Sequence, residues 1–173
     1  MDTNLQLPIC SFDAKTGILC QKCETKLKNK HITKSDVNIS KKLSKLMDKI
    51  PELDKTALIQ GMEMEEGTVL VMSNGSHDKL RKNQSLFKQL ENELKSKLWI
   101  TDIKTSNRQA LENIFFPVKI LTINVVWLPD GSKLTKVIIP GRKTKRFPLN
   151  LKQIKKVVKA VIGIELLIEF ERT

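Results

Sequence analysis

The chain has 173 residues, 40% of them hydrophobic, and carries a formal net charge of +12 with a pI near 9.7. This length suits two small domains or one domain with an appendage, and the charge favours an anionic partner without choosing among RNA, DNA and acidic lipid. The longest apolar stretches, residues 120–128 and 160–168, are too short to cross a bilayer and no signal peptide is visible, so we expect a soluble cytoplasmic protein with no membrane partner.

All three cysteines lie near the N-terminus, where Cys20 and Cys23 form a CxxC pair. An odd number of cysteines does not make a disulfide framework, whereas the CxxC spacing lets two thiolates converge on one metal ion. Together with Cys10 and the turn at residues 15–17, the pair resembles a shortened zinc ribbon, in which two knuckles are joined by a hairpin. The pattern therefore predicts a structural Zn²⁺ site.

The fourth ligand of this site is open between two residues. Asp13 stands where the second cysteine of a first CxxC would be, and a carboxylate oxygen is an acceptable zinc ligand. Free buried thiols and a redox CxxC remain alternatives, although no βαβ unit surrounds the pair. The favoured ligand set is Cys10, Asp13, Cys20 and Cys23, with His31 as the alternative fourth ligand.

The elements after the cysteines follow from apolar periodicity and stop signals. Ser35 or Asp36 caps the first long helix and Pro51 stops it. In chain order we expect an irregular basic connector (26–34), a helix (35–50), two strands (56–62 and 68–72), a short basic segment (77–84), a helix (85–98) and a strand (99–103). The order of this first round is α-β-β-(short α)-α-β.

A second round repeats this order with one short helix lost. Asn150 and Gln153 form a variant of the capping box for its last helix, and Gly163 is its stop signal. The expected elements are a helix (107–115), a long apolar strand (118–128), a turn (129–132), a strand (134–139), a basic loop (141–146), a helix (149–162) and a final strand (164–170).

Basic residues gather at the end of this second round. Between Gly141 and Lys159 there are eight Lys/Arg residues and no acid, and the helix keeps an apolar face opposite its lysines. A fixed positive field on a folded helix, fed by a basic loop at the helix N-terminus, is typical of phosphate binding, and a solvated lysine face is the alternative. The residues are Arg142, Lys143, Lys145 and Arg146 in the loop and Lys152, Lys155, Lys156 and Lys159 on the helix.

The order of the two rounds resembles tandem type II KH domains and is similar to that of the small archaeal NusA-like transcription factors. The stretch LRKNQSLFKQLENELKSKLWI, residues 80–100, is similar to the KH loop with its following helix and strand. The resemblance implies an α+β fold in which a zinc-ribbon-like segment (1–33) precedes two degenerate KH-like domains (34–104, αββααβ, and 105–173, αββαβ).

The chain departs from the KH pattern at the loop that grips nucleic acid. A GXXG loop brings the backbone close to phosphates, but the first round has Arg81-Lys82-Asn83-Gln84 there, and the second has Gly141-Arg142-Lys143-Thr144 nearby. The resemblance implies an RNA-binding protein of transcription elongation or termination that contacts single-stranded or structured RNA mainly through phosphates, with Lys79, Arg81 and Lys82 as a second basic set. The alternative is a non-catalytic adapter that docks on RNA polymerase or the ribosome.

The aromatic residues and the polar residues point away from other functions. Trp99 and Trp127 lie on expected strands, where core packing is favoured over stacking on a base, and Phe115, Phe116 and Phe170 are expected in the core. The sequence lacks a P-loop motif, a nucleophile–histidine arrangement and a paired carboxylate site. We therefore expect neither catalysis nor a small-molecule substrate.

Overall fold

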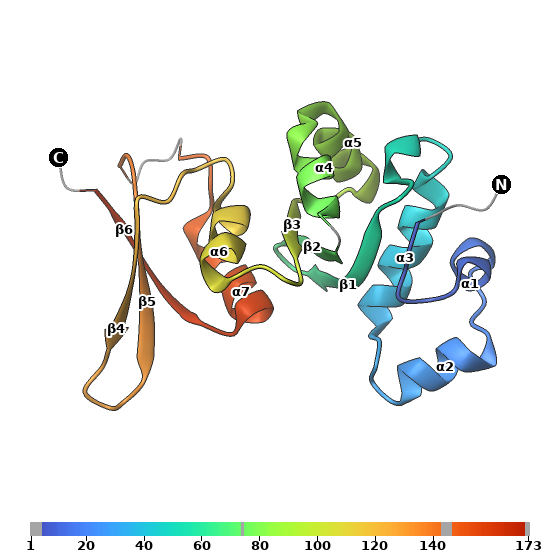
Figure 1. Ribbon diagram of the computed structural model, residues 1–173, viewed down its shortest axis with the longest axis horizontal. Coiled ribbons are helices and arrows are strands. Elements are labelled where there is room, and N and C mark those ends of the chain that lie inside the picture. The colour runs from blue at the N-terminus through green and yellow to red at the C-terminus, as the bar shows by residue number, and fades with distance from the viewer. Residues whose placement is uncertain (1–4, 74, 143–146, 172–173) are drawn as a thin grey trace. The chain divides into compact units, whose positions relative to one another are not determined.

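The computed structural model describes residues 5–73, 75–142 and 147–171 (Figure 1). The chain divides into two compact units, Met1–Lys104 and Thr105–Thr173, which we call the first and the second unit. The described residues form a mixed α+β protein with seven α-helices and two three-stranded sheets. Each of these helices falls short of the length and apolarity that a membrane span requires.

The segment around the cysteines is helical. Instead of the expected hairpin, it contains α1 (Ser11–Thr16) and α2 (Gln21–Lys28). The prediction of a zinc-ribbon-like knuckle is therefore wrong, and so is the prediction of an irregular connector for residues 26–28. The turn seen in the sequence is the end of α1, where Gly17 adopts a φ of +81°, a left-handed conformation that glycine reaches without strain. Upstream of α1, Gln6 forms a β-bridge with Ala57, which ties the N-terminal segment to the sheet of the first unit.

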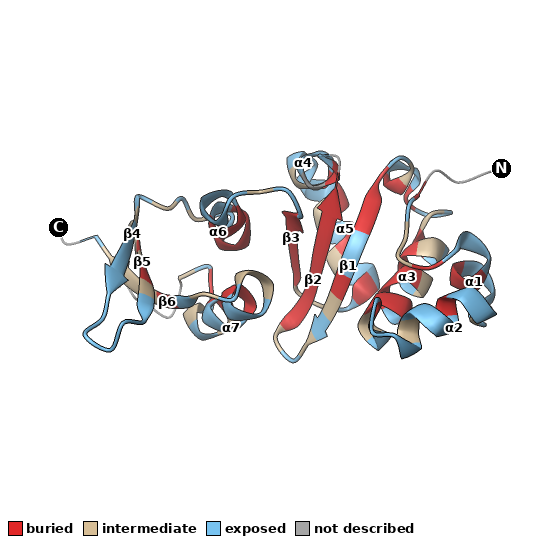
Figure 2. Ribbon diagram, turned by 60° about the horizontal axis from the view of Figure 1, so that its bottom comes forward, coloured by how far each residue is buried: buried red, intermediate tan, exposed pale blue. Residues whose placement is uncertain are grey.

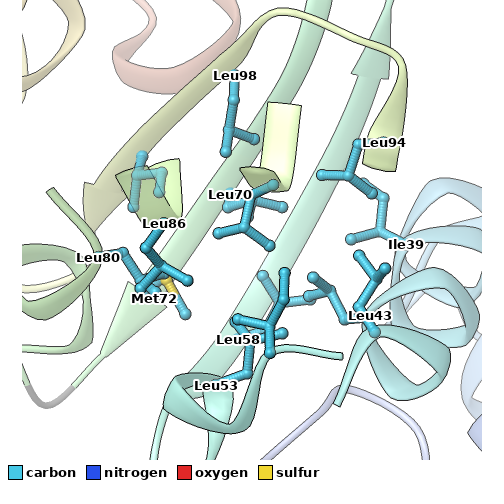
Figure 3. Close-up of a cluster of buried hydrophobic side chains, with 14 of the residues drawn as sticks. Ile39, Leu43, Leu53, Leu58, Leu70, Met72, Leu80, Leu86, Leu94 and Leu98 are labelled. Atoms are coloured by element: carbon cyan, nitrogen blue, oxygen red, sulfur yellow. The ribbon is translucent and has the colours of Figure 1, made fainter. Parts of the chain in front are cut away.

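The rest of the first unit is one sheet covered by helices. Its elements are α3 (Lys34–Leu46), a 3₁₀ turn η1 (Pro51–Leu53), β1 (Ala57–Met64), β2 (Gly67–Ser73), α4 (Ser76–Lys82), α5 (Gln84–Leu94) and β3 (Leu98–Asp102). The strand order is β1-β2-β3, antiparallel between β1 and β2 and parallel between β2 and β3. Side chains from both layers, among them Ile39, Leu43, Leu70, Met72 and Leu94, meet in a single core (Figure 3).

Several boundaries differ from the sequence expectation. The first long helix begins at Lys34 because Thr33, rather than Ser35 or Asp36, is its N-cap. The helix expected to reach Leu98 ends at Leu94, because Lys95 takes a left-handed φ of +51° and β3 starts at Leu98. The short basic segment is the helix α4.

The second unit repeats the order with one helix fewer. Its elements are α6 (Asn107–Phe115), β4 (Thr122–Trp127), β5 (Lys133–Ile139), α7 (Leu151–Ile162) and β6 (Glu165–Phe170). The strand order is β4-β5-β6, again antiparallel and then parallel, and Figure 1 shows both helices on one side of the sheet. The expected order of elements is therefore confirmed in both rounds, although β4 is shorter than the strand expected over residues 118–128.

The aromatic residues divide between core and surface. Trp99 and Phe115 are buried, as expected, and Phe170 is half-buried with its ring 5.2 Å from that of Phe147. Phe116 and Trp127 are exposed, so the expectation that they belong to the core is wrong. Trp127 lies at the end of β4, and Figure 2 shows that strand as exposed.

Asp36 joins α3 to the sheet of the first unit. Its Oδ2 accepts hydrogen bonds from the backbone N–H and the hydroxyl of Thr33, at 2.7 and 2.9 Å, and completes a capping box. Its Oδ1 accepts the backbone N–H of Gly61 in β1 at 2.6 Å. A Cβ at position 61 would lie 2.6 Å from Cδ1 and 3.1 Å from Cβ of Ile39, so a side chain there would crowd α3. Both oxygens of a buried carboxylate are thus satisfied by the protein.

We predict that Asp36→Ala lowers the free energy of unfolding by about 3 kcal/mol, because it removes the carboxylate half of the capping box and leaves the buried N–H of Gly61 without an acceptor. Asp48→Ala, at an exposed position beyond the end of the same helix, is the matched control and should change the free energy by less than about 0.5 kcal/mol. Urea unfolding of both variants measures the difference. Equal values for the two variants would contradict the role assigned to Asp36.

Candidate metal centre

The N-terminal helices bring together two pairs of donor residues. Cys10 is the N-cap of α1 and Asp13 its third residue, and Cys20 and Cys23 hold the same two positions on α2. Side chains at the N-cap and at the third helical position lie next to each other, which is why a capping box forms between them. Both CxxD and CxxC therefore present two donors at the start of a helix.

The two pairs face each other. The Sγ atoms of Cys10, Cys20 and Cys23 and a carboxylate oxygen of Asp13 all lie within 4.8 Å of one another. Asp13 and Cys23 are buried, Cys20 is half-buried and Cys10 is exposed. These four residues lie close enough to bind one metal ion.

The environment of the buried Asp13 carboxylate favours a bound cation. Its Oδ2 accepts the backbone N–H of Cys20 at 3.0 Å, which fixes the start of α2 against α1. Its Oδ1 is fully buried and has no hydrogen-bond partner of ordinary geometry among the described residues. The facing thiols do influence this carboxyl, but a thiol is a weak donor, so we regard Oδ1 as unsatisfied. A buried carboxylate oxygen in this state is costly unless a positive charge meets it.

The pKa values describe the cluster without a metal as an ionised Asp13 carboxylate beside protonated Cys10 and Cys23 thiols. Burial by itself raises the pKa of the Asp13 carboxyl, but hydrogen bonds from the Cys23 thiol and the Cys20 amide outweigh burial and hold that pKa well below its usual range. Burial and the Asp13 carboxylate raise the pKa of the Cys23 thiol to about 12. Burial also raises the pKa of the Cys10 thiol; the backbone N–H of Asp13 opposes that rise, and the Asp13 carboxylate adds to it. A bound metal ion would displace the protons of these thiols, because a metal binds cysteine as the thiolate.

The cluster sits beside a small apolar core that joins the N-terminal helices to α3. This core contains Ile9, Ala14, Ile32 and Val37 together with Cys23. Leu7, Leu19 and Leu27 pack against it from its rim. So small a core anchors two helices weakly, and a metal ion bound to both helices would add a direct link between them.

His31, the alternative fourth ligand, is not part of the cluster. It follows α2 at an exposed position, where its backbone N–H donates to the carbonyl of Lys26 at 2.9 Å. Among the described residues, the group of potential ligands contains Asp13 and not His31.

The basic residues expected to bind RNA lie in both units. In the first unit Lys79 and Lys82 are exposed on α4, whereas Arg81 is half-buried. Burial lowers the pKa of the Arg81 guanidinium, and the nearby Asp78 opposes that shift. Lys79 and Lys82 are therefore better placed than Arg81 for contact with a phosphate.

In the second unit the helix lysines are exposed as the sequence predicts. Lys152, Lys155, Lys156 and Lys159 are exposed on α7, and Lys159 forms an ion pair with Glu165. Asn150 Oδ1 accepts the backbone N–H groups of Lys152 and Gln153, at 3.1 and 3.3 Å, so these two amides are not free for a phosphate. Arg142 is exposed, and the other loop residues, Lys143, Lys145 and Arg146, lie outside the described residues.

One contact was missed by sequence reasoning. Nζ of Lys133 lies 4.4 Å from the ring centroid of Trp127, and the two residues are paired across the β4–β5 hairpin. The available signal was the position of Lys133 directly after the expected turn, opposite Trp127 in a hairpin.

No protein-family model matches the chain, and no curated protein matches it. Among solved structures, the chain is similar to the crystal structure of APE1850, with a TM-score of 0.45 and 16% sequence identity over 75% of this chain and 95% of that chain. A similarity at this level supports no statement about function.

We predict that Asp13→Ala weakens cobalt(II) binding by roughly 100-fold or more, whereas His31→Ala binds it like the parent chain. The reason is that Asp13 is a buried member of the cluster and His31 lies outside it. Titration with cobalt(II) against a chromophoric chelator measures both affinities. Loss of binding in His31→Ala with retention in Asp13→Ala would reverse the assignment of the fourth ligand.

Proposed function

We propose that this chain is an RNA-binding protein of the NusA-like KH class, acting in transcription elongation or termination, and that its N-terminal cluster holds one structural Zn²⁺. The order of elements supports the class, because αββααβ followed by αββαβ is the order expected of tandem type II KH-like domains. The protein holds RNA mainly by its phosphates.

The observation that carries the RNA proposal is the division of α7 into two faces. Ile154, Val157 and Val158 are fully buried, which fixes the helix in the second unit. Its lysines lie on the exposed face, and none of the ion pairs among the described residues involves Lys152 or Lys155. Charges that are held on a rigid helix and not neutralised locally attract a polyanion without competition from the protein's own acids.

The connection between α4 and α5 supports phosphate binding by side chains rather than by the backbone. No glycine stands at this turn, and Asn83 instead caps α5 by accepting the backbone N–H of Leu86 at 3.1 Å. The backbone therefore cannot approach a phosphate as closely as the backbone of a GXXG loop does. Phosphates are then bound by side chains such as Lys79 and Lys82, which gives contacts that do not depend on base identity.

The donor set supports zinc as the metal. Three thiolates and one carboxylate satisfy the four-coordinate preference of Zn²⁺. The ligand atoms lie within 4.8 Å of one another, somewhat wider than the roughly 3.8 Å between thiolates around one zinc, so a small inward movement completes the site. The role is structural, because all four positions of the ion are taken by protein ligands that join α1 to α2.

We predict that zinc affinity rises with pH between about pH 6 and 8. The Cys23 and Cys10 thiols have raised pKa values, so zinc displaces their protons on binding, and the affinity increases by roughly tenfold per pH unit for each thiol that releases one. Competition with a chelator of known pH dependence measures the slope. An affinity that does not change with pH would contradict thiolate ligation.

We predict that the double variant Lys152→Ser/Lys155→Ser binds single-stranded RNA more weakly by a similar factor for every sequence. Loss of two phosphate contacts flattens the dependence of log K on log salt concentration by roughly 1.4. Fluorescence anisotropy with oligoadenylate and oligouridylate at several salt concentrations measures both effects.

Lys34→Ser/Lys45→Ser, which removes two exposed lysines from α3, is the matched control and should leave the slope unchanged. If the parent chain shows no salt-dependent affinity for RNA but co-purifies with RNA polymerase or the ribosome after RNase treatment, the adapter function replaces the RNA proposal.

A further inference from the structure

The tip of the β4–β5 hairpin is held by its own hydrogen bonds. The N–H of Leu128 donates to the carbonyl of Ser132, and the N–H of Gly131 donates to that of Leu128, both at 2.9 Å. Gly131 has a φ of +83°, which glycine accepts without strain. Asp130 Oδ1 accepts both the N–H and the hydroxyl of Ser132. The hairpin therefore presents the side chains beside its turn in a defined geometry.

The β4–β5 hairpin extends beyond α6 and α7 (Figure 1), and Trp127, the last residue of β4, is exposed. Ile123, Val125 and Trp127 are paired with Val137, Thr135 and Lys133, so all of them point to the face of the sheet that carries the helices. Along this face of β4 exposure increases toward the turn: Ile123 is half-buried, Val125 is 58% exposed and Trp127 is 65% exposed. A large ring is thus left in solvent where the covering helices end.

Lys133 gives this ring a particular chemistry. Its ammonium lies 4.4 Å from the centroid of the Trp127 ring, a cation–π distance, and an ammonium over a ring occupies one of its two faces. Because most of the Trp127 side chain is exposed, apolar ring surface lies in solvent next to a positive charge. A nucleobase with its phosphate matches both features, since a base stacks on one ring face and a phosphate accepts from an ammonium.

The charge of the second unit favours the same partner. Residues 105–173 contain 13 Lys/Arg and five Asp/Glu, so this unit carries a net charge of 13 − 5 = +8, the larger part of the +12 of the whole chain. An apolar groove on a protein would have to bury the Lys133 ammonium with the ring, which is costly without an acid to pair it.

A lipid surface fits the hairpin less well than RNA does. Asp130 lies in the turn, beyond Trp127, so insertion of the tip into a membrane would bury its carboxylate. The hydrogen bonds from Ser132 lower the pKa of Asp130, which keeps that carboxyl ionised and opposes insertion.

We propose that Trp127 and Lys133 form a stacking platform for one base of a single-stranded RNA, with Lys133 contacting an adjacent phosphate. This inference rests on the proposed function that the chain binds RNA, and it adds a contact to bases that the lysines of α7 do not provide. Because every base has a flat face, the platform accepts any base and contributes affinity rather than sequence preference.

The test compares oligoadenylate with an abasic oligonucleotide of the same length and charge, both titrated into the full chain. Trp127→Ala should weaken binding to oligoadenylate by roughly 5- to 100-fold and leave binding to the abasic strand unchanged. Trp127→Phe should retain most of the affinity, because a phenyl ring still stacks. Lys133→Ala should weaken binding to both strands. Leu121→Ala, which shortens an exposed apolar side chain elsewhere in the second unit, is the matched control and should change neither affinity.

The outcomes separate the two proposals. If the parent chain binds neither strand, the proposed function fails. If the parent chain binds both strands and Trp127→Ala binds oligoadenylate like the parent, the platform is refuted and the RNA proposal stands. The parent chain could instead bind anionic phospholipid vesicles, with Trp127→Ala abolishing that binding and leaving RNA affinity unchanged. That result would assign the ring to a lipid surface and overturn the platform.

Fluorescence gives an independent check, because Trp99 is buried and quenching on addition of oligoadenylate reports Trp127.

Discussion

A buried carboxylate has to find a partner for each of its oxygens, and the first unit contains two such groups at the same helical position. Asp36 is the third residue of α3, and its oxygens accept hydrogen bonds from Thr33 and Gly61. Asp13 is the third residue of α1; its Oδ2 accepts the Cys20 amide, while Oδ1 has no partner of ordinary geometry among the described residues and meets only thiols, which are weak donors. The Asp36 carboxylate joins α3 to the sheet. The Asp13 carboxylate has an oxygen that a metal ion can coordinate.

The contrast explains how the N-terminal helices are anchored. The core beside the cluster is small, and α1 and α2 are short, so neither helix is stable through its own packing. The Asp13–Cys20 hydrogen bond links the two helices in the protein itself. A structural zinc would add four stronger bonds at the same place and relieve the unfavourable burial of the carboxylate. The same four residues would then both bind the ion and hold the two helices together.

The second unit places its charge and its exposed ring on different elements. The lysines of α7 lie opposite a fully buried face, so they are held in place by the core beneath them. Trp127 and Lys133 are held by the register of a hairpin whose turn has its own hydrogen bonds. Phosphates and bases would thus be contacted by separate rigid elements, which explains how a protein without a GXXG loop could still bind both parts of a nucleotide.

The sequence alone determined the order of the elements and which four residues come together as candidate metal ligands. Apolar spacing along α5 and α7 and stop signals such as Gly163 are local, so they predict helices wherever the chain goes. The position of Asp13, three residues after Cys10 and so where the second cysteine of a first CxxC would stand, likewise selected the residue that the structure brings to the cysteines.

What the sequence did not determine depends on contacts between distant residues. The turn at residues 15–17 was compatible with a hairpin or with the end of a helix. In the structure it is the end of α1, and α1 packs against α3. The apolar strand expected over residues 118–128 was expected to place Trp127 in the core, but burial depends on how far the covering helices reach along the strand. Only the tertiary structure decides that reach, because a strand's alternation says which face a residue shares and not whether anything covers that face.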